Sequence, residues 1–272
     1  MKAGFSIEQK QDFKRVCAKF YNFVQTQRPL DLSIILNYHS IHPTNTFSTK
    51  PADFLQQMQY LANEFNVLSL PQFHKLRLDC EKLPDKTVIV TFDDGYENNY
   101  QYAFPILAKY RLPATIFLTT AFIDKNYDIT QEHIAYRGLP PLTWENIIEM
   151  KKSGLSFGAH THTHPILTNT TLEKAEQEIA LSKKIIEERL TEPIKMFAYT
   201  LGQRNTFNNS IKALLRQHGF GLACSTIWGT NNSKTDILAL RRVRIDAQDT
   251  FDDFKSKVNG LWNFVALFQK IK

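Results

Sequence analysis

Short apolar runs alternate along the chain with longer segments in which apolar residues recur every three or four positions. The short runs are rich in β-branched and aromatic residues, which indicates buried strands, whereas the longer segments indicate amphipathic helices. The expected strands are 32–38, 87–92, 113–119, 155–161, 194–200, 220–226 and 237–245. The expected helices are 6–29, 50–65, 98–111, 143–154, 171–190, 208–219 and 250–272.

This alternation predicts parallel βαβ units and an α/β fold. About seven parallel strands in a chain of 272 residues suit a single distorted (β/α) barrel over 31–272, with an N-terminal helix over 1–30 packed on it. A barrel is favoured over an open sheet because the unusual polar residues follow several different strands. Barrel enzymes place their active sites at those carboxyl ends.

Composition narrows the classes of function. The chain carries 33 basic and 27 acidic residues, a net charge of +6, and its lysines and arginines are spread out, so we expect no nucleic-acid partner. Its three cysteines, Cys17, Cys80 and Cys224, form no CxxC pair. We therefore expect them to be reduced and not paired in disulfides, and we expect no cysteine metal site.

Two adjacent carboxylates, Asp93 and Asp94, end the β-branched run TVIVTF and precede Gly95. Neighbouring residues of a strand point to opposite faces, so both carboxylates can serve one site only where the strand unwinds. The glycine permits such a turn. The segment is also consistent with an ordinary Asp-Gly turn in which one carboxylate caps the next helix.

The stretch SFGAHTHTHPILT, 156–168, places three histidines within five residues. On an extended strand His160 and His164 would lie about 13 Å apart, whereas the ligand atoms of a zinc ion lie roughly 2.0–2.2 Å from it. A shared metal therefore requires the chain to bend as it leaves the strand, with His162 between the two ligands and off the metal. The alternative is a polar loop with capping threonines.

Together, the two segments favour a metal site more strongly than either does alone. One aspartate and two histidines from two strand ends form a set of three ligands with open positions, which is typical of a catalytic metal site and not of a structural one. The second aspartate then remains as a base.

TFDDG and HTHTHP, about 65 residues apart, resemble the first two motifs of the polysaccharide deacetylases, the family with the NodB homology domain that is also called carbohydrate esterase family 4. The resemblance runs from ILNYHSI to LRRVRID. It implies a distorted barrel that removes N-acetyl groups from amino sugars with a divalent metal. It also makes Asp93 the base and Asp94, His160 and His164 the metal ligands, for Zn²⁺ first and for Co²⁺, Ni²⁺ or Fe²⁺ as alternatives.

The third motif departs from the family pattern. MFAYTLGQR has Thr200 in place of proline, Leu201 in place of an aromatic residue, and Ala198 where many members have an arginine that orients the base. The backbone N–H of Leu201 is still expected to act as an oxyanion donor. Arg242 in LRRVRID resembles a late-strand arginine of one branch of the family and would replace the missing one. Alternatively, Arg242 lies on the surface of an edge strand.

The final Leu-x-His motif of the family is absent near the C-terminus. His39, which ends ILNYHSI, resembles a histidine of the same branch that supplies the acid, so it is expected to protonate the departing amine. The alternative for His39 is a packed core histidine. His42, His74 and His133 are expected at the surface, and His218 is expected to end a helix.

The resulting hypothesis is metal-dependent removal of N-acetyl groups from an N-acetylated amino sugar, in a polysaccharide or in a lipid-linked glycan precursor. Tyr96, Trp144, Tyr199 and Trp228 are candidates for stacking on the sugar, although aromatic residues more often pack in the core. Two alternatives remain. One is a metal hydrolase of another amide or ester, and the other is a carbohydrate-binding protein without activity.

The two ends of the chain bear on location. No signal peptide or membrane-spanning run is apparent, so the cytoplasm is the expected compartment. The tail VNGLWNFVALFQKIK, 258–272, combines large apolar residues with two lysines near its end. It is expected either to pack across the barrel or to make peripheral contact with an anionic inner membrane. The oligomeric state is not predicted.

Overall fold

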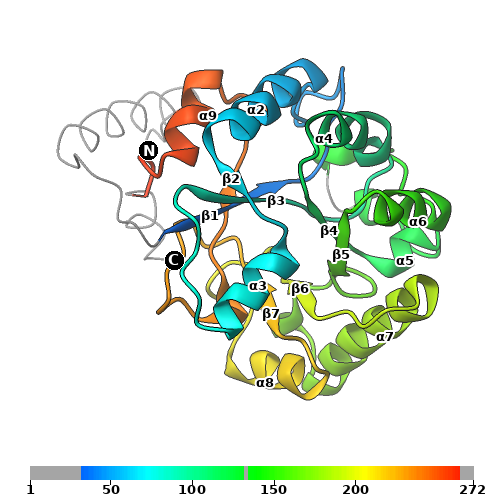
Figure 1. Ribbon diagram of the computed structural model, residues 1–272. Coiled ribbons are helices and arrows are strands. Elements are labelled where there is room, and N and C mark those ends of the chain that lie inside the picture. The colour runs from blue at the N-terminus through cyan, green and yellow to red at the C-terminus, as the bar shows by residue number, and fades with distance from the viewer. Residues whose placement is uncertain (1–31, 132–133, 264–272) are drawn as a thin grey trace, which may run out of the picture.

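Strands form where the sequence has its β-branched and aromatic runs. In the computed structural model, which describes residues 32–131 and 134–263, β1 (Ser33–Tyr38) and β3 (Thr87–Phe92) are buried along their whole length (Figure 1). The other strands are β2 (Asn66–Val67), β4 (Thr115–Leu118), β5 (Ser156–Ala159), β6 (Met196–Ala198), β7 (Leu222–Cys224) and β8 (Val243–Arg244).

Neighbouring strands of the sheet pair in parallel, in the order β7-β6-β5-β4-β3-β1-β8, with β2 paired to the start of β3. The seven strands of this path curl into a half-barrel, which confirms the predicted distorted (β/α) barrel. Leu240 bridges the seam between β7 and β8. Its N–H donates to the Ala223 carbonyl at 2.9 Å, and its carbonyl accepts from the Ser225 N–H at 2.8 Å.

Helices surround the sheet in Figure 1. Three of them begin after a threonine whose hydroxyl caps a free N–H group of the first turn, namely Thr143, Thr171 and Thr250. The α-helices are α2 (Pro51–Glu64), α3 (Leu70–Leu78), α4 (Phe104–Tyr110), α5 (Thr120–Ile123), α6 (Trp144–Lys152), α7 (Leu172–Leu190), α8 (Asn209–Gln217) and α9 (Phe251–Val258). A π-helical turn, Asn99–Ala103, precedes α4.

α3 was not predicted, although it begins with a capping box in which Ser69 and Gln72 bond reciprocally, a pattern visible in the sequence. Leu70 and Phe73 of this helix pack among the inward-facing residues of the barrel. His74 is therefore buried, contrary to the prediction, and lies against Gly221, where the lack of a side chain leaves room for the ring.

The interior of the barrel becomes more polar toward the carboxyl ends of the strands. Ile35 and Ile89 point inward at one level and belong to an apolar cluster. Two residues further on, Asn37 and Thr91 point inward as polar residues, and two residues beyond Thr91 comes Asp93. Because every second residue of a strand points to the same face, the Asp93 carboxylate lies at the mouth of the barrel.

The predicted strand over 237–245 was wrong. The segment contains a 3-10 turn (Ile237–Ala239), the seam residue Leu240 and only a two-residue strand, β8. It cannot form one continuous strand because its two halves pair with different partners: Leu240 lies beside β7, whereas β8 lies beside β1. The Asn231 side chain instead bonds both the N–H and the carbonyl of Arg241.

Several predictions concern residues that lie outside the described ranges. These are the N-terminal helix, Cys17, His133 and most of the C-terminal tail, so the membrane contact of that tail stays a prediction. Within the described ranges, no helix is both long and apolar enough to cross a bilayer.

Candidate active site

Asp93 enters the barrel mouth as the first residue after β3. Its side chain is nearly inaccessible to water and forms a bidentate ion pair with Arg242. Arg242 Nη1 lies 2.7 Å from Asp93 Oδ1, and Arg242 Nη2 lies 2.7 Å from Asp93 Oδ2. Asn37 Nδ2 also donates to Asp93 Oδ2 at 3.2 Å. Burial alone would raise the pKa of Asp93, but the charge and hydrogen bonds of Arg242, together with the charges of His160 and His39, hold the pKa below its ordinary value. Asp93 is therefore ionised at neutral pH.

Arg242 is 1% exposed, so the structure places it inside the barrel and not on the surface of an edge strand. Its Nε donates to the Ser225 carbonyl at 2.8 Å, and Nη1 lies 3.3 Å from Thr91 Oγ1. These contacts fix the plane of the guanidinium, and the bidentate pairing then fixes the carboxylate. The arginine predicted to orient Asp93 thus contacts it directly.

Asp94 turns back toward the same cavity. It has a φ of 74° and Gly95 a φ of 88°, so the strand unwinds at the second carboxylate, as predicted. Aspartate is one of the few residues that tolerate this left-handed conformation. The turn lets two adjacent carboxylates face one site, against the alternation of a strand.

The histidine segment bends as predicted after β5. Thr161 and His164 both have a φ of 65°, and the His164 N–H donates to Thr161 Oγ1 at 3.0 Å. The rings of His160 and His164 consequently lie with their centroids 5.0 Å apart. His162 points elsewhere, and its Nδ1 lies 2.8 Å from Thr120 Oγ1.

Asp94, His160 and His164 converge into a triad of donor atoms that all lie within 4.8 Å of one another. Asp94 Oδ1 lies 3.4 Å from Nε2 of each histidine, is buried, and has no hydrogen bond of its own. Ligands about 2.1 Å from a tetrahedral ion are themselves about 3.4 Å apart, so this spacing suits a divalent metal. His160 Nδ1 donates to the Ala198 carbonyl at 2.8 Å, which leaves the Nε2 lone pair free to bind one.

Glu178 of α7 supports residues 160–164, which we call the histidine loop. This residue was not predicted. It is 1% exposed, and its carboxylate accepts from the backbone N–H groups of His162 and Thr163, at 2.9 and 2.7 Å, and from the Thr163 hydroxyl at 2.8 Å. These bonds hold the bend that brings the rings of His160 and His164 together. In the sequence, Glu178 is indistinguishable from a surface partner of Lys174 four residues earlier.

His39 lies directly after β1 at the barrel mouth, half-buried. Its ring stacks on Tyr136, with centroids 5.8 Å apart and an interplanar angle of 11°. Burial lowers the pKa of His39 below its ordinary value, while the charges of Asp94 and Asp93 act in the opposite direction. Tyr136 is a neighbour that sequence reasoning missed, and burial raises its pKa to about 12.

The third motif keeps its position despite its unusual residues. Leu201 adopts a φ of 58°, its side chain is exposed, and its N–H donates to no residue of the described chain. Thr200, in place of proline, donates its hydroxyl to the Pro165 carbonyl at 2.5 Å and so ties this loop to the histidine loop. The backbone N–H of Leu201 is therefore available, as an oxyanion donor requires.

The four aromatic residues predicted to stack on sugar are buried instead: Tyr96, Trp144, Tyr199 and Trp228 are at most 9% exposed. Tyr199 bonds the Leu238 carbonyl, and Trp144 bonds Asp124. Aromatic rings with large apolar area are most stable inside the core. His218 does end α8, as predicted, and its Nε2 lies 3.0 Å from Glu176.

Comparison with known proteins places this arrangement in a family. The family model for polysaccharide deacetylase matches residues 81–223, which include Asp93, Asp94 and the histidine loop. The YxkH protein of Bacillus subtilis, named as a candidate polysaccharide deacetylase, is 30% identical over 82% of this chain and 74% of its own. A poly-β-1,6-N-acetyl-D-glucosamine N-deacetylase of Staphylococcus epidermidis is 29% identical over 70% of this chain and 72% of its own.

A solved structure agrees with this result. The deacetylase PplD of Streptococcus pyogenes, in complex with acetate, superposes with a TM-score of 0.74 and 26% identity, covering 85% of this chain and 99% of that one. The chain belongs to the polysaccharide deacetylase family, as the TFDDG and HTHTHP motifs implied.

Removing the Glu178 carboxylate should loosen the histidine loop and weaken metal binding by the triad. We expect Glu178→Ala to raise the dissociation constant for Zn²⁺ by about 10- to 100-fold, the usual effect of losing a group that orients metal ligands. Glu178→Gln keeps an oxygen that accepts both N–H groups and should lose less. Competition with a chromophoric chelator measures both constants. Glu188→Ala, on an exposed part of the same helix, is the control, and unchanged affinity in Glu178→Ala would contradict the role.

Proposed function

We propose that the protein is a metal-dependent N-deacetylase that removes acetyl groups from an N-acetylated amino sugar in a glycan. The observation that carries this proposal is the division of two adjacent carboxylates between two tasks. Asp94 faces two histidines in a spacing suited to a metal, whereas Asp93 is held by an arginine and stays free of the triad.

The names of the relatives support the substrate class. A Staphylococcus epidermidis relative is named for removal of acetyl groups from poly-β-1,6-N-acetyl-D-glucosamine, and PplD was solved with acetate, the product that N-acetyl hydrolysis releases. A β-1,6-linked N-acetylglucosamine oligomer is therefore the first substrate to test.

Asp94, His160 and His164 would hold the divalent metal, and such an ion supplies Lewis acidity to an amide carbonyl and to water. Asp93 removes a proton from the attacking water, because its carboxylate is ionised and points into the mouth of the barrel. Arg242 keeps that carboxylate charged and fixes its orientation.

His39 and Leu201 complete the proposed reaction. The Leu201 N–H donates to the oxygen on which negative charge develops, as a preorganised backbone donor does. His39 passes a proton to the departing amine, and its stacking on Tyr136 holds the ring in place.

The direct test of the activity is release of acetate. Wild-type protein loaded with Zn²⁺ should release acetate from β-1,6-linked N-acetylglucosamine oligomers, and Asp93→Asn should do so at least ~100-fold more slowly, the lower end of the contribution of a general base. Coupled enzymatic detection of acetate measures both rates, and circular dichroism checks that the variant is folded. Binding of the oligomers without acetate release by the wild type would favour a carbohydrate-binding protein. Acetate release from an ester alone would favour the other hydrolase.

The ligand assignment predicts different outcomes for two neighbouring histidines. His164→Ala should lose bound metal and activity together, because it removes one of three donors. His162→Ala should keep both, because the His162 ring contacts Thr120 and not the triad. Inductively coupled plasma mass spectrometry of the dialysed proteins gives the metal content. Full occupancy in a folded His164→Ala variant would overturn the assignment.

The role of His39 predicts a pH dependence. Because burial lowers its pKa from the ordinary 6.5, the protonated ring is lost as the pH rises through a value below 6.5. A rate that needs this proton should decline on the alkaline side of that value, and kcat/KM reports the decline for the free enzyme. His39→Gln should be slower and should lack the decline. An identical alkaline limb in wild type and variant would remove His39 from the mechanism.

A further inference from the structure

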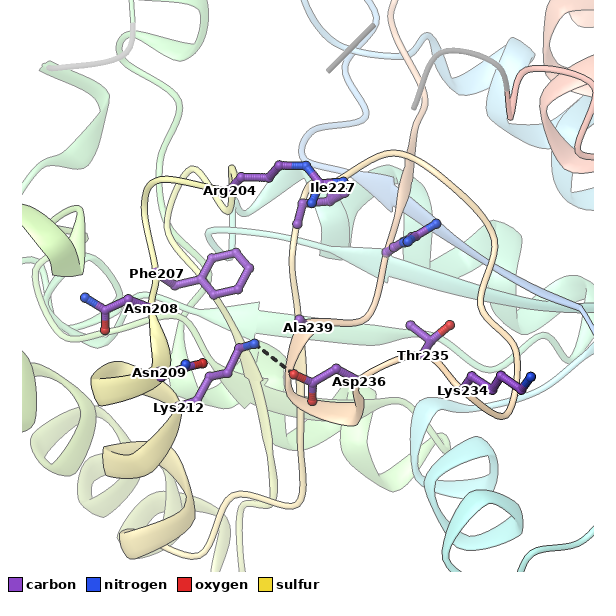
Figure 2. Close-up of a pocket in the computed structure, with 11 residues that line it drawn as sticks. Arg204, Phe207, Asn208, Asn209, Lys212, Ile227, Lys234, Thr235, Asp236 and Ala239 are labelled. Carbon is purple, nitrogen blue, oxygen red and sulfur yellow. Dashed lines mark hydrogen bonds and ion pairs between the residues drawn. The ribbon is translucent and has the colours of Figure 1, made fainter. Parts of the chain in front are cut away.

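A hollow of about 470 Å³ lies between the start of α8 and the segment that follows β7 (Figure 2). Its charged lining residues are Arg204, Lys212, Lys234, Arg241 and Asp236, and we call it the basic groove. None of these residues takes part in the metal triad or in the ion pair of Asp93.

The groove carries unbalanced positive charge. Lys212 Nζ pairs with Asp236 Oδ2 at 2.8 Å, the contact drawn as a dashed line in Figure 2, so these two charges offset each other. In the part of the chain that the structure describes, no carboxylate lies within ion-pair distance of Arg204, Lys234 or Arg241. Three cations therefore surround one hollow, and a negatively charged group placed there would gain from all of them.

The walls of the groove are held in place. Arg77 of α3 donates to the carbonyls of Asn232, Ser233 and Thr235 and so fixes the loop that carries Lys234. The buried Asn231 side chain bonds the backbone of Arg241 on both sides, at 2.8 and 2.9 Å. These bonds fix the backbone from which the Lys234 and Arg241 side chains extend, so less conformational entropy is lost on binding than from a flexible loop.

The first turn of α8 adds to this environment. Asn208 and Asn209, at the N-terminal end of the helix, line the groove. Asn208 Oδ1 satisfies the Ile211 N–H at 3.0 Å, and the helix directs its positive end toward the same hollow. Helix end and side chains therefore favour the same sign of ligand charge.

The groove adjoins the third motif of the candidate active site, because Arg204 at its edge follows Leu201 by three residues, which span at most about 11 Å. Leu201, the oxyanion donor, accepts a hydrogen bond from Thr226 Oγ1 at 2.5 Å. Ile227, which follows Thr226, also lines the groove. A chain of sugars with its acetamide at Leu201 would therefore reach the groove within a short distance of its reacting unit.

We propose that the basic groove binds an acidic group, a carboxylate or a phosphate, on the glycan chain whose acetamide is hydrolysed, and so selects acidic glycans as substrates. This rests on the proposed function, because the same glycan has to reach both sites. A glycan fits better than a nucleic acid, since the cations surround a single hollow beside the active site and do not form a stripe.

The test compares binding of three oligosaccharides of equal length to the full chain, with a chelator present to prevent turnover. The first is a neutral N-acetylglucosamine oligomer, the second is a heparosan oligomer in which glucuronate alternates with N-acetylglucosamine, and the third is the neutral oligomer bearing a phosphomonoester. Isothermal titration calorimetry should show about tenfold tighter binding of at least one acidic probe, the gain expected from charge-assisted hydrogen bonds. The probe that gains more identifies the preferred anion.

The variants separate the groove from general charge. Arg204→Gln/Arg241→Gln should abolish the preference for the acidic probes and leave affinity for the neutral oligomer unchanged. Lys82→Gln/Lys184→Gln removes the same charge from side chains that are 69% and 71% exposed elsewhere, and it should keep the preference. Equal affinity for all three probes, or an equal loss in both double variants, would overturn the proposal.

Failure of the groove proposal can be distinguished from failure of the proposed activity. If a neutral oligomer is deacetylated and acidic probes bind no better, the groove proposal is wrong and the deacetylase proposal stands. If an acidic probe binds through the groove but never yields acetate, the deacetylase proposal is wrong and the groove still binds acidic glycans.

Discussion

Arg242 and Asp93 meet inside the barrel, where both side chains are removed from water and two hydrogen bonds of 2.7 Å join them. Breaking such a pair by removing one partner costs about 3–5 kcal/mol, because the remaining charge stays buried and unpaired. The seam of the barrel depends on the same region: Arg242 lies between Leu240, which bonds to β7, and β8, which bonds to β1. The segment that runs from β7 to β8 therefore also carries the arginine that orients the carboxylate.

The pair also explains how two adjacent aspartates take different roles. Asp93 continues the inward alternation of β3 and meets an arginine, whereas Asp94 leaves the strand through a left-handed turn and meets two histidines. Like charges this close would normally compete for protons. Opposite charge on one and paired imidazoles on the other keep the pKa of both below the ordinary value, although burial acts to raise each of them. Each carboxylate can then act at neutral pH.

The elements that hold the site were predictable where local pattern and tertiary contact agree. β3 is rich in β-branched residues, five of its six, so both the strand and the position of Asp93 at its end followed from sequence. Arg242 was found through family resemblance, but the predicted strand around it failed because Leu240 pairs across the seam. Glu178 was not predictable, since only the bend of the histidine loop buries it. The aromatic candidates failed because burial of a ring depends on tertiary packing, which periodicity does not encode.

We propose that Asp94, His160 and His164 bind the metal while Asp93 stays free of it. Diffraction from crystals soaked in Zn²⁺, measured at the zinc absorption edge, locates the ion. We expect one strong anomalous peak within roughly 2.0–2.2 Å of a carboxylate oxygen of Asp94 and of Nε2 of both histidines, with Asp93 still paired to Arg242. A zinc ion coordinated by Asp93, or zinc bound only outside the triad, would overturn this division of roles.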